Sequence, residues 1–211
     1  MVSTIAVDKI ETVNETHVDM SAGISGSINL NGSISGATTA SIKAPGMIIQ
    51  TQGTTFSNRF TFDPDGTWTE CGSGALYPWR VSITPTSLTN KLFMQLHLFA
   101  NDTGTNDIWN WKLVDMTEDN TGNTLVTPKG DGAGSRFEGH FAHRGKYDSN
   151  DPIMQNYILY ADITRTTATT YTLWGRNGDG GAPIYVNYSS SDNGSWGFTG
   201  VCSFIIQEIQ I

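Results

Sequence analysis

The amino-acid sequence predicts an all-β protein: an antiparallel two-sheet jelly-roll sandwich that follows an extended N-terminal arm. Three observations lead to this prediction. Only 15% of the 211 residues are charged and 23 are Gly, a composition that disfavours long helices. Eight to ten short strand-like segments are separated by turn signals, with no alternation of strands and helices. A Gly/Ser-rich repeat precedes these segments.

The repeat lies in the first of two predicted regions, an arm of residues 1–44 ahead of a body of residues 45–211. Ser25-Gly-Ser-Ile28 returns six residues later as Asn31-Gly-Ser-Ile34. This repetition spaces four apolar residues evenly among Gly, Ser and Asn: Ile24, Ile28, Leu30 and Ile34. One extended chain cannot bury them, but three copies wound together can turn them toward a common axis. The repeat therefore predicts a trimeric stalk, with a flexible linker as the alternative.

The body is predicted to consist of short strands. Candidate segments are residues 47–52, 59–62, 68–71, 80–84, 91–99, 107–115, 135–141, 156–163, 169–174, 183–187 and 200–211. Asp63-Pro-Asp-Gly66 is a strong turn signal. Residues 91–99 are apolar enough to predict a strand buried on both faces. In residues 107–115, Trp109, Trp111 and Leu113 or Val114 compete for the inward-facing positions. The apolar C-terminal segment needs a covering layer, from the other sheet or from a neighbouring subunit.

Charge and cysteine usage exclude several classes of protein. The formal net charge of −8 disfavours binding to nucleic acid and to anionic membranes. No segment has the length of a membrane span, and residues 1–5 lack the features of a signal peptide. Cys71 and Cys202 lie far apart in the sequence, which favours buried free thiols over a disulfide.

No coherent catalytic or metal-binding pattern is present. His140 and His143 lie near Glu138, but in a strand His143 would point away from the other two side chains. Two turn segments, residues 63–66 and 177–181, offer oxygen ligands without the spacing of a calcium loop. No nucleophile elbow, phosphate loop or dinucleotide fingerprint occurs. We therefore expect no enzyme activity, no cofactor and no metal.

Two groups of residues on predicted loops are candidates for contact with a receptor glycan. One is Trp79 with Tyr77, and the other is Trp196 with Asp192 and Asn193. An exposed indole ring offers a flat face to a sugar, and short polar side chains can bind its hydroxyl groups. Burial in the core and contact between subunits are the alternative uses of these aromatic residues.

Five short blocks occur along the body in a fixed order. They are Pro45–Gln52, Arg80–Ser87 followed by Asn90-Lys-Leu, Thr169–Leu173, Ile184–Asn187 and Phe204–Ile209. This order resembles the C-terminal modules of marine bacteriophage virion proteins, especially the tail-fibre-like proteins of cyanophages. Residues 1–10 look like the start of the same proteins. The resemblance implies a trimeric jelly roll, similar to C1q-like heads, on a virus particle. Longer loops are expected at residues 102–134 and 142–151.

The combined expectation is a bacteriophage virion structural protein, a short homotrimeric tail fibre involved in attachment to the host surface. Its arm would dock on other virion proteins and its jelly roll would face a host glycan. It would be made in the host cytoplasm and exposed on the particle. A capsid decoration or cement protein is one alternative. A stand-alone lectin is another, but a lectin needs no anchoring arm.

Overall fold

The computed structural model describes most of the predicted body. The described residues are 45–72, 78–102, 108–117, 122, 124–132, 138–144, 153–177, 182–189 and 199–211. The predicted arm and its stalk repeat, residues 1–44, lie outside this part of the chain and stay predictions.

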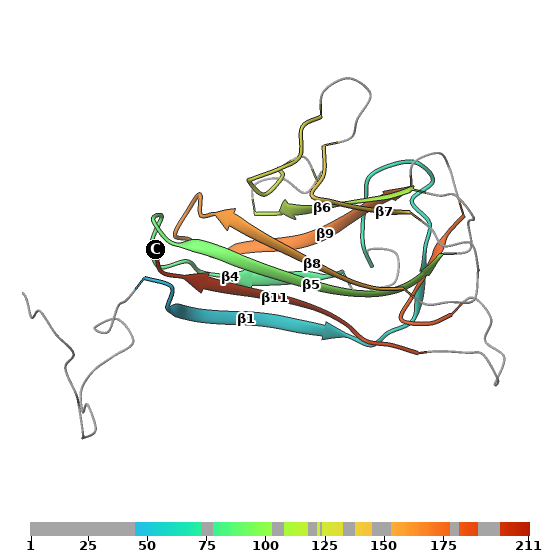
Figure 1. Ribbon diagram of the computed structural model, residues 1–211, viewed down its shortest axis with the longest axis horizontal. Helices are drawn as coiled ribbons and strands as arrows, with labels where there is room; N and C mark the ends of the chain where they lie inside the picture. Colours follow the sequence, from blue (N-terminus) through green and yellow to red (C-terminus); the bar gives the residue numbers. More distant parts are fainter. Residues whose placement is uncertain are drawn as a thin grey trace, which may run out of the picture. The chain divides into compact units, whose positions relative to one another are not determined.

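The described residues form strands and no helix, and the strands fold into a sandwich of two antiparallel sheets (Figure 1). The strands are β1 (Ile48–Phe56), β2 (Phe60–Phe62), β3 (Thr69–Glu70), β4 (Arg80–Ile83), β5 (Lys91–Asp102), β6 (Ile108–Asp115), β7 (Phe141–Arg144), β8 (Ile153–Asp162), β9 (Thr169–Asn177), β10 (Ile184–Val186) and β11 (Cys202–Ile209). The predicted fold class, an all-β antiparallel sandwich consistent with a jelly roll, is confirmed. In the described part of the chain, no helix is long and apolar enough to cross a membrane.

Sheet A contains β1, β2, β5, β8, β10 and β11. β11 lies between β1 and β5, and β8 pairs with the other edge of β5 (Figure 1). β10 pairs with the end of β5 and with β2. Among the described strands, β8 has a partner on one side only, which makes it an edge strand.

Sheet B contains β3, β4, β6, β7 and β9. Its central strand is β9, which pairs with β6 along one edge and with β3 and β4 along the other. β7 extends the sheet beyond β6. The strong alternation of β-branched and aromatic residues in β9 suits this central position, because both edges and both faces of the strand are covered.

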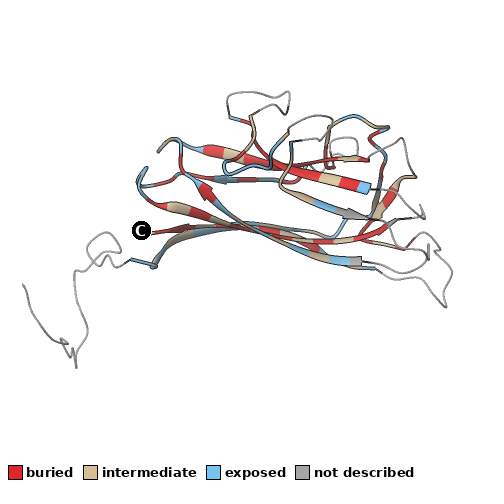
Figure 2. Cartoon of the chain, turned by 45° about the horizontal axis from the view of Figure 1, so that its top comes forward, coloured by how far each residue is buried: buried red, intermediate tan, exposed pale blue. Residues whose placement is uncertain are grey.

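The core fills the space between the two sheets. Buried and less buried residues alternate along β5 and β11 of sheet A. Figure 2 shows the buried and less buried bands that alternate along the strands. The inward side chains include Leu92, Met94, Leu96, Leu98, Phe204 and Ile206 from sheet A, and Trp109, Trp111, Leu113 and Leu173 from sheet B. Gly175 makes room for this core, because a Cβ there would lie 2.5 Å from the Trp111 ring and 2.6 Å from the Phe62 ring.

Both tryptophans of β6 are buried, and so are Leu113 and Val114. All four side chains are inside because residues 111–115 of β6 are buried on both faces of the strand. Val114 belongs to a second, smaller cluster with Met116, Trp174 and the partly buried Trp68. The Lys112 ammonium group lies 4.4 Å from the centroid of the Trp68 ring, a cation–π contact. Burial lowers the pKa of Lys112 to about 8, although the charge of Glu138 opposes this shift.

One expectation about sheet A is wrong. β5 is fully buried on its inward face only, because its outward residues Phe93, Gln95 and His97 are partly exposed. For the apolar C-terminal segment, the structure selects the first of the two expected coverings: the inward side chains of β11, such as Phe204 and Ile206, pack in the core between the sheets. The C-terminal strand therefore gives no support to the predicted trimer, which now depends on the arm and on the surface described below.

Two local predictions agree with the structure. Residues 63–66 form a tight turn, with Asp65 and Gly66 at positive φ and the Thr67 N–H donating to the Pro64 carbonyl oxygen at 3.0 Å. Cys71 and Cys202 are buried free thiols. Burial raises the pKa of both thiols, so neither is a reactive thiolate at neutral pH.

Candidate functional site

A cleft of about 330 Å³ is lined by residues from both sheets. Asp115 ends β6, Tyr171 lies on β9, and Asp162 ends β8. The other lining residues come from two connections: Thr164 and Arg165 after β8, and Thr124, Leu125, Val126 and Thr127 before β7. Strand ends and connections together therefore make a cleft with polar and apolar lining on a rigid scaffold, which is a common position for binding sites.

An ion pair lies on one side of this cleft. Arg165 Nη1 is 3.0 Å from Asp115 Oδ2, and the exposed fractions of the two side chains are 17% and 6%. The Thr117 N–H donates to Asp115 Oδ1 at 2.9 Å, which fixes the carboxylate further. Burial, assisted by the charge of Asp115, raises the pKa of Tyr171 to about 12. The phenol is therefore neutral at physiological pH.

One wall of the cleft is the segment 124–127, which is tied to both sheets. The Thr124 carbonyl oxygen accepts from the Asp115 N–H at 2.9 Å, and the Val126 N–H donates to the Leu113 carbonyl oxygen at 3.1 Å. The Thr127 carbonyl oxygen accepts from the Asp162 N–H at 2.9 Å. Bonds to β6 in sheet B and to β8 in sheet A therefore hold this wall in one conformation.

His140 supports the same wall from behind. Its Nε2–H donates to the Val126 carbonyl oxygen at 2.8 Å, and its Nδ1 accepts from the Leu113 N–H at 3.0 Å. Burial lowers the pKa of His140, so the ring is neutral, as this bonding pattern requires. Both ring nitrogens are occupied, which leaves neither for a metal. The described residues contain no group of three or more His, Cys, Asp or Glu side chains placed to hold a metal ion.

A second surface is the outward side of sheet A, here called the outer face. It is formed by Phe93 and Gln95 of β5, Met154, Ile158 and Tyr160 of β8, and Ile205 of β11. Met154, Ile158 and Tyr160 are each more than half exposed. The Phe93 and Tyr160 rings contact each other across the two strands, with centroids 5.0 Å apart. The outer face thus carries exposed apolar side chains along edge strand β8, with the hydrogen-bonded pair His97 and Asn156 between Met154 and Ile158.

Trp79 is not on the surface, and the prediction that it lies exposed on a loop is wrong. Its side chain is fully buried between the sheets. The ring stacks on Phe56 with a centroid distance of 4.7 Å, and the edge of Phe60 meets it at 6.3 Å. The reason is strand alternation, because Trp79 continues the inward series of Val81 and Ile83 on β4. A ring without exposed area offers no face to a glycan.

The other predicted site residues lie outside the described part of the chain. These are Tyr77, Asp192, Asn193 and Trp196 of the glycan-contact candidates and Ile24, Ile28, Leu30 and Ile34 of the stalk. Their roles stay predictions. Sequence reasoning also missed Asp115 and Arg165, which are 50 residues apart and carry no motif. No sequence signal links them, because only the folding of β6 against the β8–β9 connection brings them together.

A buried carboxylate, Glu208, is the centre of a polar network in sheet A. Its Oε1 accepts hydrogen bonds from the Thr86 N–H at 2.9 Å, the Thr86 hydroxyl at 2.8 Å and Asn90 Nδ2 at 2.6 Å. Its Oε2 accepts from Gln50 Nε2 at 2.7 Å. Burial alone would raise the pKa of Glu208, but the hydrogen bonds from Gln50, Asn90 and Thr86 outweigh burial and lower it. The carboxylate is therefore ionised in the folded chain at neutral pH.

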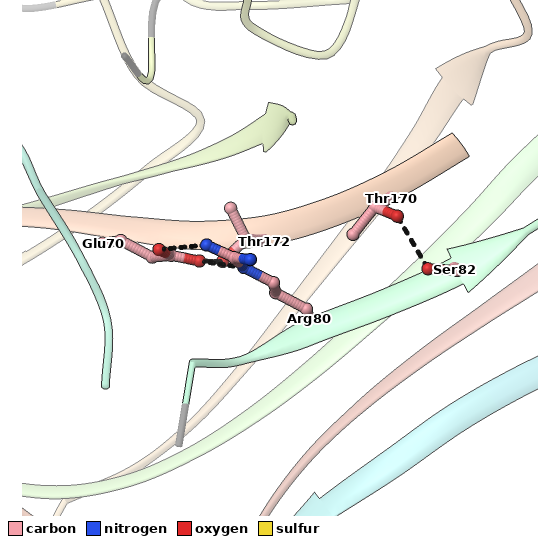
Figure 3. Close-up of polar contacts among 5 residues, drawn as sticks. All are labelled: Glu70, Arg80, Ser82, Thr170 and Thr172. Carbon is pink, nitrogen blue, oxygen red and sulfur yellow. Dashed lines mark hydrogen bonds and ion pairs between the residues drawn. The ribbon is translucent and has the colours of Figure 1, made fainter. Parts of the chain in front are cut away.

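A second carboxylate network joins β3, β4 and β9 in sheet B (Figure 3). Arg80 donates from Nε and Nη2 to the two oxygens of Glu70, at 2.7 and 2.8 Å. The buried Thr172 hydroxyl donates to Glu70 Oε1 at 2.9 Å, and nearby the hydroxyls of Ser82 and Thr170 lie 2.7 Å apart. This bidentate pair fixes the ends of β3 and β4 against β9.

A third network surrounds Asn187, which follows β10 with a φ of 65°. Its Nδ2 donates to the carbonyl oxygens of Phe56 and Asn58 at 2.7 and 3.0 Å. Its Oδ1 accepts from the Cys202 thiol at 2.8 Å. Asn tolerates the left-handed conformation better than most residues do. One side chain therefore links the end of β1 to the start of β11.

Comparisons with known proteins identify no family for this chain. No protein-family model matches it, and no curated protein matches it. Among solved structures, it is similar to the CBM22-1 xylan-binding domain of Paenibacillus barcinonensis Xyn10C. The alignment has 7% sequence identity and a TM-score of 0.29, and it covers 81% of this chain and 99% of that domain. So distant a likeness carries nothing about the ligand of this chain.

Proposed function

We propose that this protein is a structural protein of a bacteriophage particle, a short homotrimeric tail fibre that helps to attach the particle to its host. The observation that carries the proposal is the position of the blocks that resemble marine phage virion proteins. Gln50, Thr86, Asn90 and Glu208 come from three separate blocks, and their side chains meet in the Glu208 network. The two other blocks take part in the fold elsewhere. The block Thr169–Leu173 pairs with β4 through Thr169–Thr172. The block Ile184–Asn187 supplies Asn187, the centre of the third network.

This convergence supports the resemblance because the blocks are far apart in the sequence. Gln50 and Glu208 are separated by 158 positions, yet their side chains are hydrogen-bonded. Short matches that arose by chance would fall at unrelated places on the surface. Residues that meet in buried networks instead point to one module whose fold they maintain. Their role is structural, which fits a virion protein better than an enzyme.

The outer face supports the homotrimer. β8 is a ten-residue edge strand with exposed apolar side chains at Met154, Ile158 and Tyr160. A long apolar edge strand is a template for pairing with another chain unless something covers it. A further copy of this chain is the occupant that we propose, since the regular stalk repeat of the arm also requires identical partners.

The full chain is expected to sediment at three times its 22.9 kDa mass. Ile158→Lys places a charge on the outer face and should weaken assembly by at least about tenfold, because burying an unpaired charge costs several kcal/mol. Ser82→Lys, on the exposed side of β4 in sheet B, serves as the matched control. A monomeric native chain at micromolar concentration would contradict the trimer, and an Ile158→Lys trimer of native strength would remove the outer face from the interface.

The role on the particle is tested by competition. Host cells incubated with an excess of the purified chain should adsorb fewer phage particles, because the chain occupies the receptor. A capsid decoration protein would leave adsorption unchanged and would instead bind to expanded capsids that lack it. Labelling of particles with an antibody against the chain, viewed by electron microscopy, gives the location directly. Label on the capsid surface alone would favour the decoration alternative.

A further inference from the structure

The cleft beside Asp115 combines hydrogen-bond acceptors and donors at close range. The Asp115 carboxylate offers about four acceptor positions, more than its contacts with Thr117 and Arg165 use. Thr124, Thr127 and Thr164 line the same space, and a threonine hydroxyl can both donate and accept. A sugar hydroxyl also donates and accepts at once, so it needs both kinds of group side by side.

The charge and size of the cleft narrow the class of ligand. Its lining carries two carboxylates, and each is paired with a cation: Asp115 with Arg165 and Asp162 with Lys91. An anionic ligand would have to compete with these carboxylates for the cations, whereas a neutral ligand would not. Its volume of about 330 Å³ lies at the lower end of the range of about 300–1,000 Å³ for ligand pockets. A small neutral ligand fits these limits.

The polar groups of the cleft are held in place before any ligand arrives. Arg165 and the Thr117 N–H orient the Asp115 carboxylate, and both side chains of the ion pair are largely buried. Backbone hydrogen bonds to Leu113, Asp115 and Asp162 fix the segment 124–127. Binding groups that are ordered in the free protein lose little entropy when a ligand binds. Leu125 and Val126 add apolar atoms that can contact the C–H side of a sugar ring.

We propose that this cleft binds a neutral saccharide through Asp115 and the hydroxyl of Thr124. The ligand is about one or two sugar rings long, as the volume allows. The inference deepens the proposed function, because it rests on attachment to the host and names the surface group that is recognised. It also places recognition on the body of the chain at a site other than the predicted aromatic loops.

Calorimetric titration of the full chain tests the site. The probes are glucose, galactose, mannose, N-acetylglucosamine, maltose and lactose, with galacturonate as the anionic control. At least one neutral probe should bind with a dissociation constant in the millimolar range, and galacturonate should bind more weakly. Thr124→Val removes a hydroxyl without changing the side-chain shape and should weaken binding by about three- to tenfold. Asp115→Asn should weaken it by at least about tenfold.

Thr51→Val on β1, away from the cleft, is the matched control and should bind as the native chain does. The inference is overturned if no neutral probe binds at tens of millimolar, or if Thr124→Val, which leaves the ion pair intact, binds unchanged. The two proposals fail separately. If the native chain and Thr124→Val compete equally for phage adsorption, the cleft is not the receptor site, but attachment stands. If a saccharide binds while adsorption is unaffected, the cleft stands and the tail-fibre function fails.

Discussion

Trp79→Ala is expected to lower the free energy of unfolding by about 3–5 kcal/mol, the range for large buried aromatic residues. The ring is fully buried and contacts Phe56 and Phe60, which come from the end of β1 and the start of β2. Its removal leaves a cavity beside Phe56 and Phe60. Chemical denaturation of the variant and the native chain, followed by fluorescence, measures the difference.

Two further variants make this test specific. Trp79→Phe should lose only about 1–2 kcal/mol, because Trp79 Nε1 makes no hydrogen bond within the described part of the chain. Leu88→Ala removes a large apolar side chain that is 59% exposed, and it should change stability by no more than about 0.5 kcal/mol. A Trp79→Ala variant as stable as the Leu88→Ala control would show that Trp79 is a surface residue after all.

Glu208→Ala should be about as destabilising, on the order of 3–5 kcal/mol. Asn90 is a buried donor that loses its acceptor, which costs about 1–3 kcal/mol. The hydrogen bonds from Thr86 and Gln50 are lost as well, at about 1 kcal/mol each. Glu208→Gln retains one oxygen, but its amide nitrogen would face the amide nitrogen of Gln50. The stability of Glu208→Gln should therefore lie between those of the native chain and Glu208→Ala. Urea denaturation at neutral pH measures both variants.

The contribution of Glu208 depends on pH in a defined direction. Its folded pKa lies below the ordinary value of 4.5, so the folded chain holds the ionised form more strongly than the unfolded chain does. The stabilisation is complete above about pH 4.5 and is lost as the pH falls from there through the lowered pKa. The gap in stability between the native chain and Glu208→Gln should therefore shrink in acid.

Glu138→Gln is the matched control for this titration. Like Glu208, Glu138 is a carboxylate that accepts a hydrogen bond, here from Lys129 Nζ at 2.7 Å, but its side chain is 46% exposed. An exposed ion pair of this kind contributes little to stability, about 0–1 kcal/mol. Its loss should therefore leave the decrease in stability at acid pH unchanged. If Glu138→Gln reduced the decrease in stability at acid pH as much as Glu208→Gln does, the buried Glu208 network would not be the cause of that decrease.

Strand periodicity determined the fold class from the sequence alone. Alternating apolar residues in segments such as 200–211, together with turns such as residues 63–66, indicated an antiparallel sandwich. These signals are local, because side chains in a strand point to opposite faces in strict turn. The same alternation, extended two residues back from Val81, would have placed Trp79 in the interior. Tyr77 and Pro78 suggested a loop instead, so this continuation of the strand pattern was missed.

Only the tertiary structure decided which strands are neighbours and which polar residues meet. Alternation along β11 predicts that Glu208 points inward. It does not predict that Gln50, Thr86 and Asn90 donate hydrogen bonds to its carboxylate. In the same way, nothing local connects Asp115 to Arg165. The apolar outer face was also invisible, because the sequence of β5 reads as buried on both sides. Periodicity reports the face of each residue, whereas sites depend on contacts between segments far apart in the chain.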